Sequence, residues 1–550
     1  MAVHIDTGNM RSPVQYQSKT LEHLGLVSGM YDELEIGKLI DQAIPQDLTQ
    51  RTVSIGQAIK AMVLNGLGFT QKALYLTPLF FKDKPVDILI GEGIEASHLN
   101  ESTLGRSLDS IYQYGVEKLY MLLSASTVDK LGLLNKFGHL DSTCFHTDGK
   151  HNSEEDSKEN VIQITKGYSR DHRPDLNQVV LQLICEQEAG IPLLMKPLSG
   201  NSSDNTDFRE TISAHVEEMK TDFNLQYIVA DSALYVAETL QTMKKILWIT
   251  RVPERLSLAR DSIHALAPSL MSDLTQSKFT SICTQYGDIN QRWVIKYSPQ
   301  AYQRGLKTVN KNCLKQSKAE HKAFNKLCKQ DFACEADALA ALSVFQKTLK
   351  RTQIHPSDME KTARYNSKGC PKKGQEPDYS IYHIRGSISS VIETRTRELE
   401  RKSCFILATN QLDEAELSAQ DVIDAYKNQQ KVERGFRFLK DPLFMVSTLF
   451  LESPKRIMAL TMVMTLCLQI YAALEYRIRQ VLKTKQQTFP SQKGEAISNP
   501  TARWVFQYFR GIHLLMINEV NVFVLNLNEH HLILLELLGK PYQKLYAGFR

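Results

Sequence analysis

The sequence predicts an α/β fold in which a mixed five-stranded sheet, with helices on its faces, lies between helical N-terminal and C-terminal regions. Two observations lead to this prediction. Between residues 138 and 252 the expected elements follow in the order strand, strand, strand, helix, strand, helix, strand, which is typical of a sheet covered by helices. Residues 1–130 and 451–550 instead carry apolar residues at helical spacing.

The composition indicates a multidomain globular protein of a reducing compartment. At 550 residues the chain is too long for one hydrophobic core, so we expect about three domains. A net charge of +5 permits a polyanionic partner without requiring one. The nine cysteines are odd in number and never form a CxxC pair, which argues against a disulfide framework and against structural zinc. The first thirty residues lack the apolar segment of a signal peptide, so we expect a cytoplasmic protein.

The N-terminal region, residues 1–130, is predicted to be helical. Ser54 is a suitable N-cap for one helix, and Gly66 or Gly68 is a suitable stop. A further helix is expected from near Asn100. Its inward-facing residues are Leu104, Leu108 and Ile111. Short helices with glycine joints are compatible with a helix-turn-helix that binds DNA ends, and equally with a small bundle that only packs.

Residues 131–252 are predicted to form the sheet. Two short apolar runs, 139–145 and 227–231, resemble buried strands, and each contains one acid, Asp141 and Asp231. Active sites in such sheets gather at the carboxyl ends of strands, so both acids are candidates for chemistry. Taken alone, an acid at a strand end is more often a hydrogen-bonded structural group. The other expected elements are hairpin strands over 178–186 and 191–197, helices over 204–221 and 234–245, and a strand over 247–252.

Residues 253–410 interrupt this alternation and are predicted to be a basic, mixed α/β insertion. The strands expected there cover 293–297, 381–384 and 403–408. Between residues 300 and 350 lies a long helical region rich in lysine and arginine. A basic helical arm can follow a phosphate backbone, and the alternative is a solvated helical hairpin without a partner.

Residues 426–440, within an expected helical element over 411–450, are predicted to be one helix with two faces. At about 100° per residue, two sets of side chains separate on its surface. The polar set is Tyr426, Gln429, Glu433 and Lys440, and the apolar set is Ala425, Val432, Phe436 and Leu439. The apolar stripe can bury the helix while the polar stripe presents its groups together, although a plain surface helix would show the same pattern.

The C-terminal region, residues 451–550, is predicted to be helical, to contain one strand-like patch at 520–527, and to be a candidate dimerisation region. Residues 457–474 carry no charge and reach the lower length limit of a membrane-spanning helix. The polar side chains Thr461, Thr465 and Gln469 within this segment favour a buried core helix. We therefore expect no membrane association.

Asp141, Asp231 and Glu433 are the candidate catalytic residues. A sheet can bring the two strand ends together and place the Glu433 helix beside them. Three converging carboxylates repel one another unless divalent cations neutralise them, and hard oxygen ligands suit Mg²⁺, with Mn²⁺ as a substitute. Two such ions would activate the attacking oxygen and stabilise the leaving oxygen at a phosphodiester. The three acids are therefore the predicted metal ligands.

Five blocks of the sequence together resemble bacterial insertion-sequence transposases of the DDE class. The blocks are HLDSTCF, GYSRDHRPDLNQ, YIVADSALY, WITRVP and YKNQQKVERGFRFLK. The resemblance is to the insertion-sequence-four type, in the subgroup named for insertion sequence sixteen-thirty-four, and it covers nearly the whole chain. The hallmark of that type is Tyr, two residues, Arg, three residues, Glu, six residues, Lys. Tyr426, Glu433 and Lys440 fill three of these places, and Gln429 stands where the arginine would be.

The resemblance implies an RNase H-like core with a long insertion before the glutamate helix. It also implies that Asp141, Asp231 and Glu433 bind Mg²⁺, and that Tyr426 and Lys440 contact DNA at the element ends.

Further DNA contacts are expected from basic residues near this motif. Gln429 can donate only neutral hydrogen bonds to a phosphate, so we expect weaker end binding unless Arg434 or Lys431 substitutes for the arginine. Arg251, after the last core strand, is a further candidate DNA contact.

The predicted function is therefore a DNA transposase that cuts the element ends and joins the released 3′-hydroxyl to target DNA by phosphoryl transfer. Its partners would be double-stranded DNA, both the terminal inverted repeats and the target, and the resemblance implies a homodimer in the synaptic complex. The alternatives are a DNA-binding protein that has lost catalysis and a metal-dependent nuclease.

Overall fold

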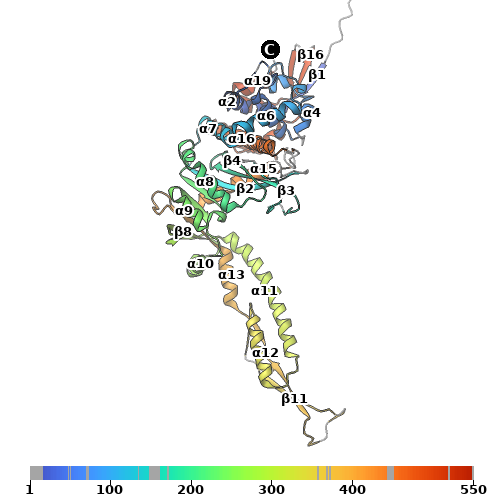
Figure 1. Ribbon diagram of the computed structural model, residues 1–550, viewed down its shortest axis with the longest axis vertical. Coiled ribbons are helices and arrows are strands. Elements are labelled where there is room, and N and C mark those ends of the chain that lie inside the picture. The colour runs from blue at the N-terminus through green and yellow to red at the C-terminus, as the bar shows by residue number, and fades with distance from the viewer. Residues whose placement is uncertain are drawn as a thin grey trace, which may run out of the picture. The chain divides into compact units, whose positions relative to one another are not determined.

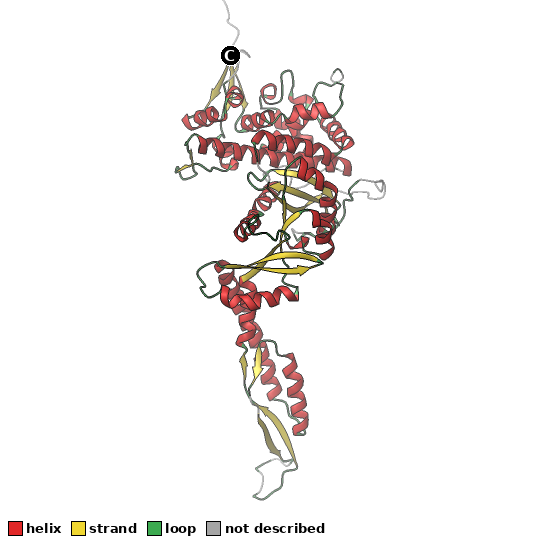
Figure 2. Cartoon of the chain, turned by 90° about the vertical axis from the view of Figure 1, so that its left-hand side faces the viewer, coloured by secondary structure: helices red, strands yellow, loops and turns green. Residues whose placement is uncertain are grey.

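A computed structural model describes most of the chain. The described residues are 16–47, 49, 51–69, 74–133, 136–147, 161–169, 172–355, 358–366, 369–370, 373–441, 451, 453–517 and 521–547. They form two compact units (Figures 1 and 2). The first unit takes its residues from 1–250, 286–289 and 423–550, and the second from 251–285 and 290–422. Parts of the predicted regions, including 1–15 and 442–450, lie outside the described residues.

The first unit begins with the predicted N-terminal helices. Ser54 caps α3 (Ile55–Leu67), which ends at Gly68, and Asn100 caps α6 (Glu101–Tyr114). The expected inner face of α6 is confirmed, because Leu104, Leu108 and Ile111 are fully buried. The other helices of this region are α1 (Leu24–Glu33), α2 (Ile36–Ala43), α4 (Thr77–Phe81), α5 (Val86–Leu89) and α7 (Val116–Leu131), with short 3₁₀ turns η1 (Leu74–Leu76) and η2 (Ala96–His98).

Helix α16 (Pro454–Thr484) joins the N-terminal helices in one layer. It packs against α1, α3, α6 and α7, so segments from both halves of the chain share a core. Its mean hydropathy of 2.0 over 18 residues would suit a membrane span, but 94% of that window is buried inside the protein. This burial favours the predicted core helix. The remaining C-terminal helices are α17 (Ala502–Tyr508), α18 (Glu529–Leu538) and α19 (Lys540–Leu545).

A small sheet connects the beginning of the described chain to its end. Strand β1 (Tyr16–Thr20) pairs antiparallel with β16 (His513–Ile517), which pairs with β17 (Asn521–Leu525). The strand-like patch predicted at 520–527 is confirmed for its described residues. Strand β1 lies in a region predicted to be helical throughout, so that prediction is wrong for these five residues. The remaining short strands, β14 (Phe489–Pro490) and β15 (Ala496–Ile497), pair with each other.

The mixed sheet predicted for residues 131–252 is present in the first unit. Its strands lie in the order β4-β3-β2-β5-β6. They are β2 (Phe137–Thr147), β3 (Asn177–Glu186), β4 (Pro192–Leu198), β5 (Tyr227–Ala230) and β6 (Leu247–Arg251). The pairs β2–β3 and β3–β4 are antiparallel, whereas β2–β5 and β5–β6 are parallel. The intervening helical elements are α8 (Asp204–Thr221), η3 (Ser232–Leu234), α9 (Ala237–Thr242) and η4 (Met243–Lys245).

The second unit contains three strands in the order β13-β8-β7 and a helical arm. The predicted helical region of 300–350 is two helices, α11 (Pro299–Cys328) and α12 (Glu335–Thr348). Buried Phe324, Ala338, Ile384 and Ile388 form the core of the arm. The strands predicted at 293–297, 381–384 and 403–408 correspond to β8, β11 and β13. The unit's other elements are α10 (Ser257–Leu270), β7 (Phe279–Tyr286), β8 (Ile289–Tyr297), β9 (Thr352–Ile354), β10 (Asp358–Arg364), β11 (Tyr379–Arg385), β12 (Ile388–Ser390), α13 (Ile392–Ser403) and β13 (Cys404–Thr409).

Candidate active site

Two of the three candidate acids follow the last pair of residues at which two neighbouring parallel strands bond to each other; Asp141 lies within β2, and Asp231 directly follows β5. The last paired residues of β2 and β5 are Leu140 and Ala230. The next residue of each chain segment is Asp141 or Asp231. Adjacent strands are about 4.8 Å apart, so the two carboxylates start from neighbouring positions. Both side chains are partly exposed, which leaves them accessible to a ligand.

Local hydrogen bonds fix both aspartates. The backbone N–H of Ser142 donates to Oδ1 of Asp141 at 2.8 Å. The N–H of Ala233 donates to Oδ1 of Asp231 at 2.9 Å, so Asp231 caps η3. The hydroxyl of Thr250 donates to the Asp231 carbonyl at 2.6 Å and links the end of β5 to β6. The local backbone therefore helps to fix the positions of both carboxyl groups.

The segment that carries Glu433 is divided into two helices, so the prediction of one continuous helix over 426–440 is wrong. Helix α14 (Ala419–Asn428) ends before Gln429, and α15 (Gln430–Leu439) follows it. The N–H of Gln429 bonds the carbonyl of Tyr426, and the N–H of Val432 bonds the carbonyl of Gln429. These bonds each span three residues, which tightens the backbone at the junction.

Gln429 faces the sheet rather than solvent. Its side-chain amide donates to the carbonyl of Leu140 at 3.0 Å, and the residue is only 7% exposed. Leu140 immediately precedes Asp141, so this contact joins the start of α15 to the part of β2 that carries the first aspartate. Gln429 therefore does not lie on a common exposed face with Glu433, as the helical spacing predicted. The amide makes a contact within the protein, and the predicted DNA contact of this residue stays a prediction.

The far end of α15 also lies on β2. The ammonium group of Lys440 is 5.9 Å from the ring centroid of Phe145. From Gln429 to Lys440 the helix rises by about 16 Å, and from Leu140 to Phe145 the strand extends by about 16 Å. The helix therefore runs alongside β2 in the same direction. Glu433 follows Gln429 by one helical turn, about 6 Å along the axis.

The predicted apolar stripe holds α15 in this place. Val432, Phe436 and Leu439 are at most 6% exposed, as is Ala425 of α14, which confirms the prediction. Glu433 and Arg434 are exposed, and Tyr426 of α14 is partly buried. The helix thus buries one stripe and leaves its carboxylate accessible.

The donor set at this site suits a hard divalent cation, because all three candidate ligands are carboxylates. Among the described residues, no group of three or more His, Cys, Asp and Glu side chains is arranged so that it could hold a metal ion. Asp141 and Asp231 would supply the adjacent pair of ligands, and Glu433 would supply the third from the neighbouring helix. The residue types therefore suit the predicted Mg²⁺ or Mn²⁺, and the joint site of the three acids stays a prediction.

A basic cavity of about 420 Å³ lies on the other side of α15. It is lined by the β3–β4 turn, α15, α16 and the start of α17. The cations in its wall are Lys431, Arg434, Arg437, Arg479 and Arg503. Arg479 pairs with Glu475 at 2.6 Å, and Arg503 pairs with Asp441 at 2.5 Å.

Lys431 and Arg434, the two possible substitutes for the arginine that Gln429 replaces, make different contacts in this cavity. Lys431 donates to the carbonyls of Gln187 and Glu188 in the β3–β4 turn, and burial lowers its pKa from the usual value. Arg434 is exposed and forms no ion pair with a described residue. Of the two, Arg434 is available to bind a phosphate.

Arg251, the remaining candidate DNA contact, belongs to the second unit. Its guanidinium lies 5.8 Å from the ring centroid of Phe405 and 3.6 Å from the carboxylate of Glu254. Both contacts leave the side chain partly exposed.

Sequence reasoning missed the polar groups buried behind the aspartates. His139, two residues before Asp141 on β2, is fully buried, and burial lowers its pKa to about 4. The imidazole is therefore neutral near neutral pH. Two polar residues in the sequence could have indicated these buried groups. They are His139, within an otherwise apolar strand, and Gln429, directly before α15.

Comparisons with known proteins match two family models to the chain. A domain of unknown function (DUF4277) matches residues 16–125, and the transposase DDE domain matches residues 135–470. A search of curated proteins found no match. A solved piggyBac transposase synaptic complex with hairpin DNA matches at 9% identity and a TM-score of 0.36, over 90% of this chain and 81% of that chain. That structural likeness is too weak to support an inference about this chain.

Proposed function

The protein belongs to the transposase DDE domain family, whose model matches more than half of the chain, and we propose that it cuts the ends of an insertion sequence and joins them to target DNA. The placement of Tyr426, Glu433 and Lys440 supports a finer assignment to the insertion-sequence-four type and its sixteen-thirty-four subgroup. The strand order β4-β3-β2-β5-β6 supports an RNase H-like core.

One observation carries the proposal. The parallel register of β2 and β5 places Asp141 beside Asp231, and the Gln429–Leu140 hydrogen bond places the Glu433 helix along the same strand. Two acids that are distant in sequence thus follow paired residues of adjacent strands, and the helix of the third acid contacts one of these strands. If one of these acids had only a structural role, the other two acids would not be needed for it.

Each group has a definite task in this mechanism. Asp141, Asp231 and Glu433 would hold Mg²⁺, or Mn²⁺ in its place, and the bound cations would activate the attacking oxygen and stabilise the leaving oxygen. The Ser142 and Ala233 amides keep the two aspartates in orientation.

Arg434, Lys440, Tyr426 and Arg251 would bind the DNA phosphates. Arg434 lies on the helix that carries Glu433, Lys440 directly follows that helix, and Tyr426 lies on the helix before it. Arg251 would add a contact from the second unit. We propose that two copies of the chain act together on the two element ends, as the family resemblance implies.

The departure at Gln429 does not by itself favour the catalytically inactive alternative. The amide links α15 to the strand that carries Asp141, so the residue would support the position of Glu433 by a contact within the protein. A metal-dependent nuclease without a preference for particular ends remains distinguishable by its substrates.

The test is Mg²⁺-dependent cleavage of DNA that carries the element ends. Asp141→Asn, Asp231→Asn and Glu433→Gln are each expected to abolish cleavage and to leave end binding unchanged, whereas Glu210→Gln, at an exposed position of α8, should cleave normally. Cleavage by Asp141→Asn at the rate of the unmodified chain would refute the assigned role. Cleavage of unrelated duplexes at the same rate as element ends would favour the nuclease.

A further inference from the structure

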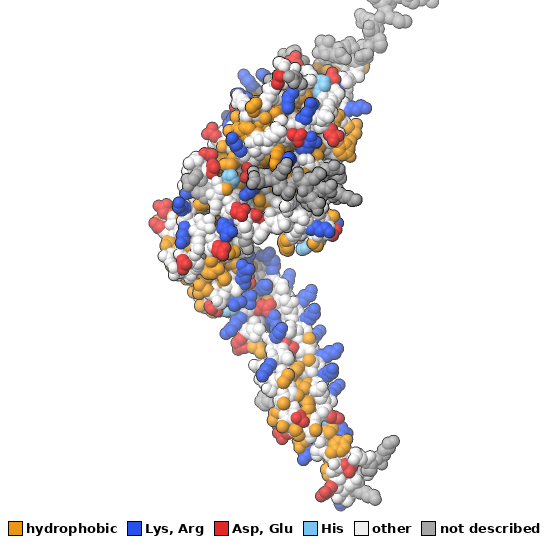
Figure 3. All heavy atoms as spheres, viewed as in Figure 1, with side chains coloured by type: hydrophobic (Ala, Val, Ile, Leu, Met, Phe, Trp, Pro, Cys, Tyr) orange, Lys and Arg blue, Asp and Glu red, His pale blue; other side chains and the backbone are white. Residues whose placement is uncertain are grey.

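Helix α11 carries one continuous row of positive charges. At about 100° per residue, the basic side chains of this helix fall within a sector about 100° wide. They are Arg304, Lys307, Lys311, Lys315, Lys318, Lys322 and Lys326, and all seven are exposed. Figure 3 shows Lys and Arg side chains following one another along the arm on the side where α11 lies in Figure 1. We call these seven residues the basic row.

The buried face of α11 fixes the direction of the basic row. Gly305, Val309 and Phe324 are buried on the opposite side, where the helix packs along α13 and contributes to the core of the arm. A Cβ added at Gly305 would come within 2.8 Å of the Cβ of Lys402, so the two helices approach closely there. The helix cannot turn its basic row inward without losing this packing.

Acidic residues do not neutralise the basic row. The one acid of α11, Glu320, is buried on the other face and accepts hydrogen bonds from the Thr352 hydroxyl at 2.6 Å and the Lys350 amide at 3.1 Å. None of the seven cations forms an ion pair with a described residue. Helix α13 differs, because Glu398 and Arg401 on it pair with Arg351 and Glu254. Like charges at this spacing destabilise a helix, so the row is unlike an ordinary solvated face with mixed charges.

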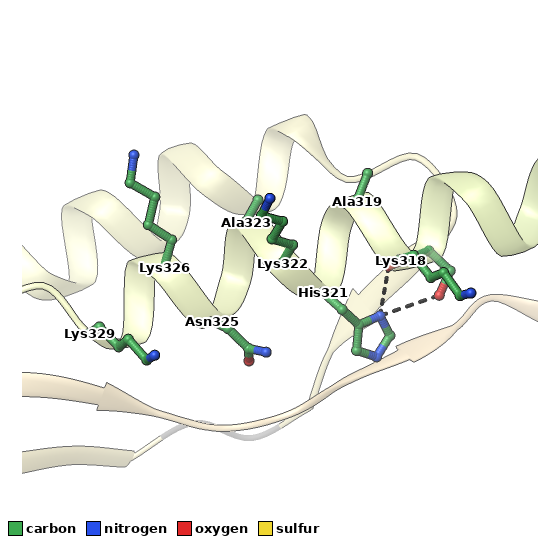
Figure 4. Close-up of a pocket in the computed structure, with 9 residues that line it drawn as sticks. Lys318, Ala319, His321, Lys322, Ala323, Asn325, Lys326 and Lys329 are labelled. Carbon is green, nitrogen blue, oxygen red and sulfur yellow. Dashed lines mark hydrogen bonds between the residues drawn. The ribbon is translucent and has the colours of Figure 1, made fainter.

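The lysines also surround an open hollow on the helix surface. Lys318, Lys322, Lys326 and Lys329 contribute to its wall (Figure 4). His321 is turned back toward its own helix, with Nδ1 2.8 Å from the carbonyl of Ser317. The ammonium groups are therefore the charged groups that a ligand would meet in this hollow.

The length and chemistry of the row suit duplex DNA. From Arg304 to Lys326 the helix rises by about 33 Å, close to one turn of B-DNA at about 34 Å. Ammonium groups bind phosphates as point charges and do not read bases by themselves. A membrane surface fits less well, because an interfacial helix inserts its apolar face, and the apolar face of α11 is occupied within the arm.

We propose that the basic row of α11 binds the phosphate backbone of double-stranded DNA without regard to sequence. Such a surface suits DNA whose sequence is not fixed, which in a transposase is the target or the DNA that flanks the element. Only the identity of this DNA rests on the proposed function. The binding itself does not.

The test compares two quadruple variants of the full chain. Lys311→Gln, Lys315→Gln, Lys318→Gln and Lys322→Gln together neutralise the centre of the row. The matched control, Lys347→Gln, Lys350→Gln, Lys361→Gln and Arg364→Gln, removes four exposed cations of the same unit outside the row. Affinity for two duplexes of unrelated sequence is measured between about 50 and 200 mM salt, and circular dichroism checks that both variants fold.

We expect the row variant to lower the slope of log affinity against log salt by about 3, with an affinity loss of about tenfold or more on both duplexes alike. The control should retain the slope. An unchanged slope in the row variant, a loss on only one duplex, absence of duplex binding by the unmodified chain, or binding to anionic vesicles in preference to DNA would overturn the proposal.

The outcomes also separate this proposal from the proposed function. An unchanged slope together with intact Mg²⁺-dependent end cleavage would reject the basic row and retain the transposase. Row-dependent duplex binding by a chain that cleaves no end substrate would retain the row and reject the transposase.

Discussion

Replacing Gln429 by alanine tests how the Glu433 helix is positioned. The substitution removes the 3.0 Å hydrogen bond from the side-chain amide to the Leu140 carbonyl. A hydrogen bond of this kind contributes about 1 kcal/mol net, and burial of the lost methylene contributes about 0.8 kcal/mol. Glutamine and alanine differ little in helix propensity. The free energy of unfolding should therefore fall by about 2 kcal/mol.

The effect on cleavage should exceed the effect on DNA binding. Gln429 links the start of α15 to the residue before Asp141, and Glu433 follows one turn later. A shift of about 1 Å in a catalytic group can reduce the rate by about 100-fold. We expect Gln429→Ala to lower the rate of end cleavage by about this factor, while the affinity for end DNA changes by less than about twofold, because the amide is buried.

The measurements are single-turnover cleavage, a gel-shift titration and urea unfolding, each repeated on Gln430→Ala. Gln430 is the next residue in the chain and is exposed, so this control should match the unmodified protein in all three assays. Loss of DNA affinity by Gln429→Ala, with normal cleavage of the bound fraction, would refute the positioning role and restore a DNA contact at this residue.

Three further predictions concern the same region. Lys431→Met keeps the side-chain stem but removes the hydrogen bonds to the β3–β4 turn, and urea unfolding should show a loss of about 1–3 kcal/mol; an unchanged midpoint would contradict this. Phe436→Ala removes a ring that is 6% exposed, and calorimetry should show a loss of about 3–4 kcal/mol; a change below about 1 kcal/mol would indicate that the stripe does not hold α15. Burial lowers the pKa of His139 from 6.5 to about 4, so the contribution of the neutral imidazole to the free energy of unfolding is complete above pH 6.5 and is lost as the pH falls toward 4. The free energy of unfolding, measured against pH, should therefore fall less steeply in His139→Gln than in the unmodified chain. Identical curves would refute this assignment.

Local patterns in the sequence predicted the bounds of helices and strands better than they predicted which distant segments pack together. The strand over 139–145 and the helix over 204–221 follow from runs of neighbouring residues, and the structure has them within a few residues of the predicted bounds. Strand β1 was missed because Tyr16 pairs with Ile517, far away in the chain. The packing of α16 into the N-terminal helices is likewise a contact between distant segments.

The same distinction holds at the candidate site. Periodicity identified the apolar stripe of α15, because burial of a helix face repeats with the helical turn. It misplaced Gln429, whose side chain leaves that pattern to bond a strand almost three hundred residues earlier. A helical wheel shows which residues share a face of a helix but not which strand that face contacts. It therefore cannot distinguish a buried amide such as that of Gln429 from an exposed one.

The most direct measurement of the shared role of Asp141, Asp231 and Glu433 is divalent-cation binding. Mn²⁺ is titrated into the full chain with bound end DNA, and into Asp141→Asn, Asp231→Asn and Glu433→Gln under the same conditions. If the three carboxylates hold the metal together, each variant should lose at least about tenfold in affinity, since even changes next to metal ligands commonly cost that much. Binding of Mn²⁺ by any of the three variants with the affinity of the unmodified chain would show that the acid does not belong to the site.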